Sequence, residues 1–168
     1  RTQMDSNKFT EKTREALSDA QSDAVRRGHQ QVDVEHLVRS LFVQEAGLAG
    51  RIAERSEIRP QDVVDALEAD LSRRPSVSGR GVTQGQITIT QRLAQLLVLS
   101  GDEAERLSDA YVSVEHLLLA AAHEAPSTGV GQAFRKVGLT RDTILGTTKS
   151  IRGNQRVTSA NPEASYEA

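Results

Sequence analysis

The sequence predicts an all-α fold of about eight helices, arranged as two related four-helix repeats with no sheet. The segment Val-x-Val-Glu-His-Leu occurs twice, at residues 32–37 and 112–117. When residues 9–37 are aligned with residues 89–117, nine of the 29 positions are identical, whereas about two are expected by chance. Apolar residues also recur at helical spacing in both halves, which indicates amphipathic helices. Internal repetition therefore organises the chain.

Four helices are expected in the first repeat, and polar caps or proline mark where they begin. Thr10 and Asp33 precede the first two helices, and their side-chain oxygens can accept hydrogen bonds from free backbone N–H groups. Gly28 ends the first helix, and Pro60 fits the first turn of the fourth. The apolar stripes of the four helices are Phe9, Ala16, Leu17, Ala20 and Ala24; Val34, Leu37, Val38, Leu41 and Phe42; Leu48 and Ile52; and Val63, Val64, Leu67 and Leu71.

The second repeat shows the same order of signals about eighty residues later. Thr90, Ser113 and Thr140 stand where the first, second and fourth helices would begin. The corresponding apolar stripes are Ile89, Leu93, Leu96, Leu97, Ala104 and Leu107; Val114, Leu117, Leu118, Ala121 and Ala122; Val130, Phe134 and Val137; and Ile144 and Leu145. The two halves are therefore predicted to share one architecture.

Composition shifts suggest where the parts of the chain begin and end. Residues 1–3 precede Met4 and read as an artificial remnant, so Met4 is taken as the natural start. The first repeat is assigned to residues 4–74 and the second to residues 87–151. Residues 75–86 are polar and rich in glycine, which predicts a hinge. Residues 152–168 have no helical stripe and are predicted to be a tether that leads elsewhere.

Composition excludes several classes of protein. The chain has 21 Lys and Arg against 23 Asp and Glu, a net charge of −2, so no basic field is available to collect phosphates. Cysteine is absent, which removes disulfides and thiolate metal sites. No apolar run approaches the roughly 20 residues of a membrane helix, and a signal-peptide core is missing. We expect a cytoplasmic protein without nucleic-acid or membrane partners.

The histidines and glycines do not form a recognisable catalytic or metal motif. His36 and His116 each follow a glutamate on an apolar helix, but no His-x-x-x-His pair accompanies them. Hydrogen-bonded packing is therefore favoured over metal binding. The chain also lacks a Gly-Lys pair for a P-loop and a Gly-x-Ser-x-Gly elbow for a hydrolase. We expect no catalytic residue, no metal site and no cofactor in this chain.

Four segments together resemble the N-terminal domain of ClpB-type protein disaggregases. They are the opening Asn-Lys-Phe-Thr-Glu-Lys-Thr-Arg-Glu-Ala-Leu at residues 7–17, both Val-x-Val-Glu-His-Leu segments, and the ending Arg-Gly-Asn-Gln-Arg-Val-Thr-Ser-Ala-Asn-Pro-Glu at residues 152–163. The resemblance covers nearly the whole chain from Met4. ClpA- and ClpC-type unfoldases share the double repeat, but the ending and the segment at residues 109–113 look more like ClpB.

The resemblance implies a pseudo-twofold pair of helical repeats on a flexible tether. Six such domains would crown a hexameric ATPase of the stress response, and each would engage apolar segments of unfolded or aggregated proteins. ATP and magnesium would bind in motor modules outside this chain, and cooperation with the Hsp70 system is implied as well. The isolated domain is expected to be monomeric and free of cofactors.

Residues that the family associates with substrate handling match Thr10, Asp109 and Glu115. Thr10 is also explained as a helix cap, and Glu115, which has its copy in the first repeat, as a requirement of the fold. Asp109 is the strongest candidate for a functional carboxylate, because a histidine takes its place in the first repeat. A groove between the repeats is predicted to expose further apolar contacts, at Phe9, Leu93 and Tyr111.

Other functions remain open at this point. An unfoldase domain of the ClpA or ClpC type would dock an adaptor and feed a protease. A free-standing scaffold would bind one folded partner, although the linker-like tail argues against it. An enzyme would require a polar cleft with perturbed groups, which the sequence does not reveal.

Overall fold

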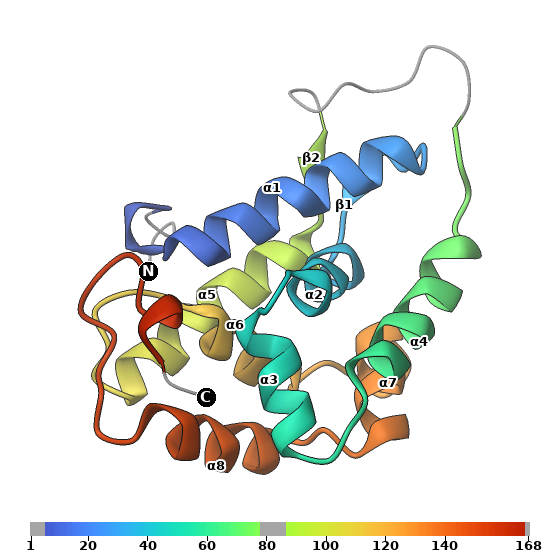
Figure 1. Cartoon of the computed structure of the whole chain (residues 1–168). Coiled ribbons are helices and arrows are strands. Elements are labelled where there is room, and N and C mark those ends of the chain that lie inside the picture. The colour runs from blue at the N-terminus through green and yellow to red at the C-terminus, as the bar shows by residue number, and fades with distance from the viewer. Residues whose placement is uncertain (1–5, 78–86, 167–168) are drawn as a thin grey trace.

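The computed structural model describes residues 6–77 and 87–166, and within them the chain forms eight α-helices (Figure 1). The prediction of an all-α fold with two sets of four helices is confirmed. The first set is α1 (Glu11–Arg26), α2 (Val34–Val43), α3 (Leu48–Arg55) and α4 (Pro60–Ser72). The second is α5 (Gln91–Arg106), α6 (Val114–Ala121), α7 (Gly129–Val137) and α8 (Arg141–Arg152). Two short 3₁₀ turns, Ser6–Lys8 and Glu163–Ser165, flank these sets.

The predicted caps start the helices as expected. The hydroxyl oxygens of Thr10, Thr90 and Thr140 accept hydrogen bonds from backbone N–H groups in the first turns of α1, α5 and α8. Asp33 and Ser113 cap α2 and α6, and each takes part in a capping box with the histidine three residues later. Such caps satisfy donors that a helix leaves unpaired at its start. The two repeats therefore use the same local chemistry.

Two short parallel strands correct the expectation that the fold contains no sheet. β1 (Gln31–Val32) pairs with β2 (Thr88–Ile89), and an isolated bridge joins Phe9 to Val112. In each repeat, the segment before the first helix thus pairs with the backbone of the other repeat. These pairings join residues far apart in sequence, so helical periodicity did not reveal them. They interlock the halves through their backbones.

Both repeats share one hydrophobic core. α2 and α6 contribute many fully buried side chains, which include Leu37, Leu41, Leu117 and Leu118, all with no exposed surface. α4 packs on α7, while α3 packs on α6 and α8. The first set of helices is therefore held against the second over several contacts. The predicted hinge lies largely outside the described residues, because residues 78–86 are not among them.

The residues predicted to form a tether are instead packed on the domain, as far as Tyr166. We refer to residues 153–166 as the C-terminal segment; it runs beside the start of α1 (red in Figure 1). The backbone N–H of Glu11 donates to the carbonyl oxygen of Ala160 at 2.7 Å. Val157 is fully buried and Tyr166 is 4% exposed. Apolar anchors and backbone hydrogen bonds hold the segment in place.

Candidate functional site

The first turn of α2 carries a buried acidic pair that two arginines neutralise. Glu35 has no exposed surface, and its carboxylate accepts from Arg74 at 2.6 Å, Arg92 at 3.0 Å and the backbone N–H of Val130 at 3.0 Å. Both arginines also contact Asp33, each at 3.0 Å. Burial opposes ionisation, but the Arg92 contacts outweigh it and hold the pKa of Glu35 below its usual range. Glu35 thereby joins α2 to α5, to α7 and to the segment that follows α4.

The second repeat has the same arrangement with a single arginine. Arg152, at the end of α8, donates to Asp109 at 2.7 and 2.9 Å and to Glu115 at 3.2 Å. His116 Nε2 lies 2.7 Å from Asp109 Oδ2. Burial alone would raise the pKa of Asp109, but the hydrogen bonds from His116 and Arg152 hold that pKa well below its usual range. Lys12 of α1 is the residue that matches Arg92 eighty positions earlier, but it pairs with Glu15 instead.

The C-terminal segment completes this second cluster. Glu163 Oε2 accepts from the Thr10 hydroxyl at 2.8 Å and from the backbone N–H of Val114 at 3.1 Å. The Tyr166 hydroxyl donates to Glu115 Oε2 at 3.1 Å, and the backbone N–H of Val157 donates to Asp109 Oδ1 at 2.9 Å. These contacts reach from the tail to α1, α6 and the turn before α6.

The structure brings three predicted site residues into this one cluster, but it covers them. Thr10 and Glu115 have no exposed surface, and the side chain of Asp109 is equally inaccessible. All three contact the C-terminal segment or Arg152, so none is free to touch a client polypeptide in this conformation. Tyr111, two residues after Asp109, is half-buried. The predicted residues are therefore a cluster of internal contacts.

The prediction that Phe9 and Leu93 line an exposed groove is wrong. Phe9 is 4% exposed and Leu93 has no exposed surface. Phe9 forms the bridge to Val112, which fixes it against the core. Leu93 lies on the inward face of α5 with Leu96, which is also buried. Helical periodicity found the stripe but gave no means of separating its covered members from its exposed ones.

The histidines pack as hydrogen-bonded side chains. His36 Nδ1 accepts from the backbone N–H of Asp33 at 2.9 Å, and its Nε2 lies 2.8 Å from His29 Nδ1. His116 makes the same cap contact, with Ser113, and uses its other nitrogen for Asp109. Within residues 6–77 and 87–166, no three His, Cys, Asp or Glu side chains are grouped so as to hold a metal ion.

An apolar stripe on the outer face of α5 escaped the sequence analysis. Gln91, Ala94, Gln95, Val98 and Leu99 line a shallow, mostly apolar depression. Val98 is 39% exposed and Leu99 is 38% exposed. Their spacing places them on one helical face, opposite the buried stripe. We call these five residues the α5 stripe.

Comparison of the repeats shows that the α5 stripe is particular to the second one. The positions of α1 that match it, eighty residues earlier, are all exposed and polar or charged. They are Glu11, Arg14, Glu15, Ser18 and Asp19. The alignment of the repeats already shows this difference between apolar positions in α5 and polar or charged positions in α1, and it is the sequence signal that indicates the stripe.

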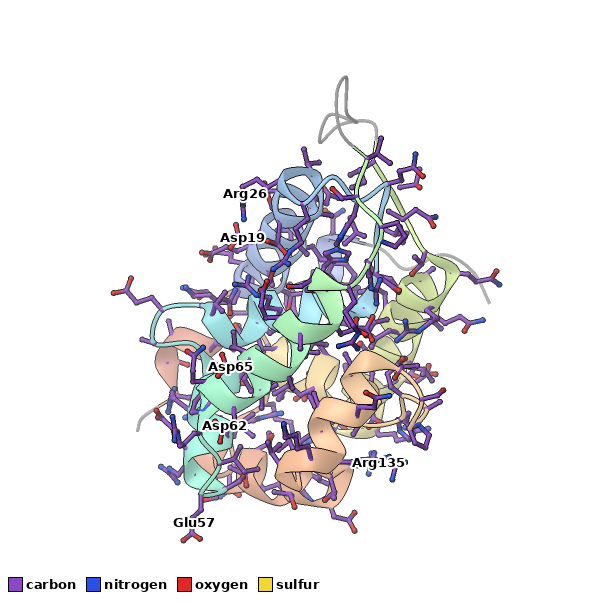
Figure 2. All side chains as sticks on the ribbon, turned by 90° about the vertical axis from the view of Figure 1, so that its right-hand side faces the viewer. Asp19, Arg26, Glu57, Asp62, Asp65 and Arg135 are labelled. Atoms are coloured by element: carbon purple, nitrogen blue, oxygen red, sulfur yellow. The ribbon has the colours of Figure 1, made fainter. Side chains whose placement is uncertain are left out.

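Another face of the domain carries mainly charge. Figure 2 shows Asp62 and Asp65 lying along α4 with Glu57 before it, and Arg135 on the neighbouring α7. The groove on this face is lined by Glu57, Ile58, Arg59, Asp62, Asp65, Ala66, Ala69, Lys136 and Val137. Water solvates such charges well, and covering them with apolar chain is unfavourable. The α5 stripe is the better surface for an apolar ligand.

In the part of the chain that the structure describes, no helix is long and apolar enough to cross a membrane.

The family model for the Clp repeat N-terminal domain matches residues 8–137. A ClpB chaperone of Nitratidesulfovibrio vulgaris is 48% identical over 165 residues, which is 98% of this chain and 19% of that protein. A ClpB chaperone of Bacillus cereus is 44% identical over the same shares. The chain therefore spans about a fifth of the length of these relatives.

Solved structures show the same fold. The N-terminal domain of Hsp104 from Candida albicans has a TM-score of 0.77 at 20% identity, and the match covers 92% of this chain and 98% of that one. A complex of the ClpV N-domain with a VipB peptide has a TM-score of 0.68 at 20% identity, with 88% and 95% covered. Together with the family match over residues 8–137, these findings establish that the chain belongs to the Clp repeat N-terminal domain family.

Proposed function

We propose that this chain is the substrate-binding N-terminal domain of a ClpB-type chaperone. In this proposal it captures apolar segments of unfolded or aggregated proteins and passes them to a hexameric motor outside the chain. The family match and the ClpB relatives, up to 48% identical, support this assignment. ATP and magnesium would act in the motor, and the Hsp70 system would cooperate with the assembled protein. The chain itself would work without a cofactor.

The α5 stripe is the observation that carries the proposal. Val98 and Leu99 are 39% and 38% exposed, and the partly exposed Ala94 continues their apolar surface along α5. Exposed apolar patches usually mark interaction surfaces. An extended polypeptide fits this one, because Gln91 and Gln95 border it with uncharged donors and acceptors for a peptide backbone. The absence of charged residues from the stripe favours apolar sequence over a charged ligand.

Weak binding suits this role. A shallow stripe on a single helix buries little area, so one domain is expected to bind a client loosely. Several tethered domains around one client would raise the local concentration of binding sites and compensate for the low affinity of each. Loose contacts would also allow a client to leave for the motor.

Exchanging the stripe for its α1 counterparts is expected to weaken client binding. The double variant Val98→Ser and Leu99→Asp places at these positions the residues found at 18 and 19. Affinity for an unfolded apolar polypeptide should fall roughly tenfold, which corresponds to about 1.4 kcal/mol of lost apolar contact. The melting temperature should stay within a few degrees, because both side chains are exposed. Fluorescence anisotropy with a labelled, permanently unfolded protein measures the affinity.

Val43→Ser is the matched control, because Val43 is 48% exposed but lies on α2. Its affinity should equal that of the unchanged chain. Equal binding by the double variant would exclude the α5 stripe as the capture surface. If the unchanged chain instead self-associates through the stripe and the double variant does not, the stripe is an interface between copies. Binding only to a folded adaptor would favour the ClpA or ClpC type.

A further inference from the structure

The C-terminal segment is held by few anchors separated by exposed chain. Val157, Pro162, Glu163 and Tyr166 are buried, whereas Gly153 to Arg156, Thr158, Ser159 and Asn161 are exposed. Two backbone hydrogen bonds of 2.7 Å, from Ala110 to Val157 and from Glu11 to Ala160, fix its course. It contains one short 3₁₀ turn, Glu163–Ser165, but no α-helix. Segments with so few buried contacts open locally more easily than core helices do.

Comparison with the first repeat shows what Glu163 does. In the first repeat, Asp33 Oδ1 accepts from the backbone N–H of Val34 at 2.8 Å and from the Thr90 hydroxyl at 2.7 Å. The second repeat has Ser113 in that position, and Glu163 Oε2 takes the two equivalent hydrogen bonds, from Val114 and Thr10. The C-terminal segment thus supplies, through Glu163, the carboxylate that Asp33 supplies at the helix cap of the first repeat.

The surroundings of the Glu163 carboxylate disfavour its charged form. Glu163 is 6% exposed and faces Glu115 of α6, and one oxygen of each carboxylate, Oε1, is buried without a hydrogen-bond partner among the described residues. The nearby cation, Arg152 of α8, contacts Glu115 and Asp109, while the Tyr166 hydroxyl also donates to Glu115. Burial and the charge of Glu115 raise the pKa of Glu163.

The raised pKa of Glu163 makes docking of the C-terminal segment weaker as the pH rises. A group whose pKa is raised in the docked state contributes stability below its ordinary value of 4.5, and this contribution is lost as the pH rises through the raised value. Near neutral pH, ionisation therefore favours release of the segment.

We propose that residues 153–166 form a latch, which exchanges between the docked state seen here and a released state in which Thr10, Asp109 and Glu115 are uncovered. Thr10, Asp109 and Glu115 then act as positioning residues for the latch. Regulation by the latch rests on the proposed function, since it concerns how the domain is connected to a motor. The 14 residues reach about 45 Å when fully extended, so release would greatly widen the range of the domain.

Hydrogen exchange on the 168-residue chain tests the latch without a client or a motor. The amides of Glu11, Ala110 and Val157 report docking, and those of Leu118 and Leu119 in α6 report the core. At pH 7 the protection factors of the reporting amides should be at least tenfold below those of the core amides. Glu163→Gln removes the charge and keeps the acceptor, so it should raise latch protection at least threefold while core protection stays unchanged.

Two further variants sharpen the test. Ser113→Asp copies the cap of the first repeat, competes for Val114 and Thr10 and repels Glu163, so it should lower latch protection. Glu105→Gln makes the same chemical change as Glu163→Gln at an exposed position of α5 and should alter nothing. Latch amides that open only with the core would overturn the proposal, as would lower latch protection in Glu163→Gln. Either result leaves the binding test of the α5 stripe unaffected.

Discussion

Arg152→Met is expected to lower the free energy of unfolding by about 3–5 kcal/mol, the usual loss when one partner of a buried ion pair is removed. Arg152 is 7% exposed and is the arginine that joins Asp109 to Glu115. Without it, two carboxylates and the adjacent Glu163 remain buried together. Methionine keeps most of the aliphatic volume of arginine, so the loss of stability reports the missing charge and not missing packing. For a chain of this size, each 1 kcal/mol should lower the melting temperature by about 2–4 °C.

Arg74→Met provides the matched control in the first repeat. Arg74 contacts Asp33 and Glu35, much as Arg152 contacts two carboxylates in the second repeat. Asp33 and Glu35, however, are also contacted by a second arginine, Arg92. Its removal should therefore cost clearly less than the removal of Arg152. Urea unfolding followed by circular dichroism measures both variants. Equal losses would show that the second cluster does not depend on a single cation and would contradict the comparison of the repeats.

Stability is expected to fall as the pH drops from 6.5 towards 4, and His36 is the main cause. Both of its ring nitrogens are committed, one to the N–H of Asp33 and one to His29, so an added proton has no acceptor. Burial, followed by the positive charge of His29 and Arg74, lowers the pKa of His36 to about 4.

The size of this effect follows from the difference between the folded and unfolded pKa. An unfolded histidine titrates near 6.5, so the unfolded state binds the proton first and stability is lost as the pH falls through this window. The difference of about 2.5 units corresponds to about 3 kcal/mol. Unfolding in urea at pH 7, 5.5 and 4.5 measures the loss.

His29→Asp should reduce this acid sensitivity by at least half. The substitution places a carboxylate beside His36, as Asp109 lies beside His116 in the second repeat. A carboxylate accepts the Nε2 hydrogen and favours the protonated ring, so the pKa of His36 should rise. NMR titration of the imidazole signals follows this directly. An unchanged loss between pH 6.5 and 4 would show that other groups control acid unfolding.

Local patterns were sufficient to predict the helices. Thr10, Asp33 and Pro60 mark helix starts through contacts within a few residues, and such signals are readable in one dimension. The repeat then supplied the second set of four helices. The fold class and the matching of the two halves therefore followed from the sequence. The β1–β2 pairing did not, because its partners are 57 residues apart and neither segment has the length of an ordinary strand.

The candidate site was predictable only in part. Asp109 and Glu115 were identified by resemblance, and Asp109 also by the difference between the repeats; the structure places both in one cluster with Thr10. Their coverage by the tail was not foreseen, since Thr10 and Glu163 are 153 positions apart. The α5 stripe was missed for another reason. Two apolar stripes share α5, and burial of one depends on neighbours that periodicity does not identify.

Residue-by-residue NMR titration of the isotope-labelled chain with an unfolded apolar polypeptide tests the central claim most directly. Capture on the α5 stripe predicts weak, saturable shifts centred on Ala94, Val98 and Leu99, with smaller shifts around Thr10, Asp109 and Glu115 if binding also moves the latch. Absence of shifts on α5 with every unfolded polypeptide, together with tight binding of one folded adaptor, would contradict the account and assign the domain to an unfoldase.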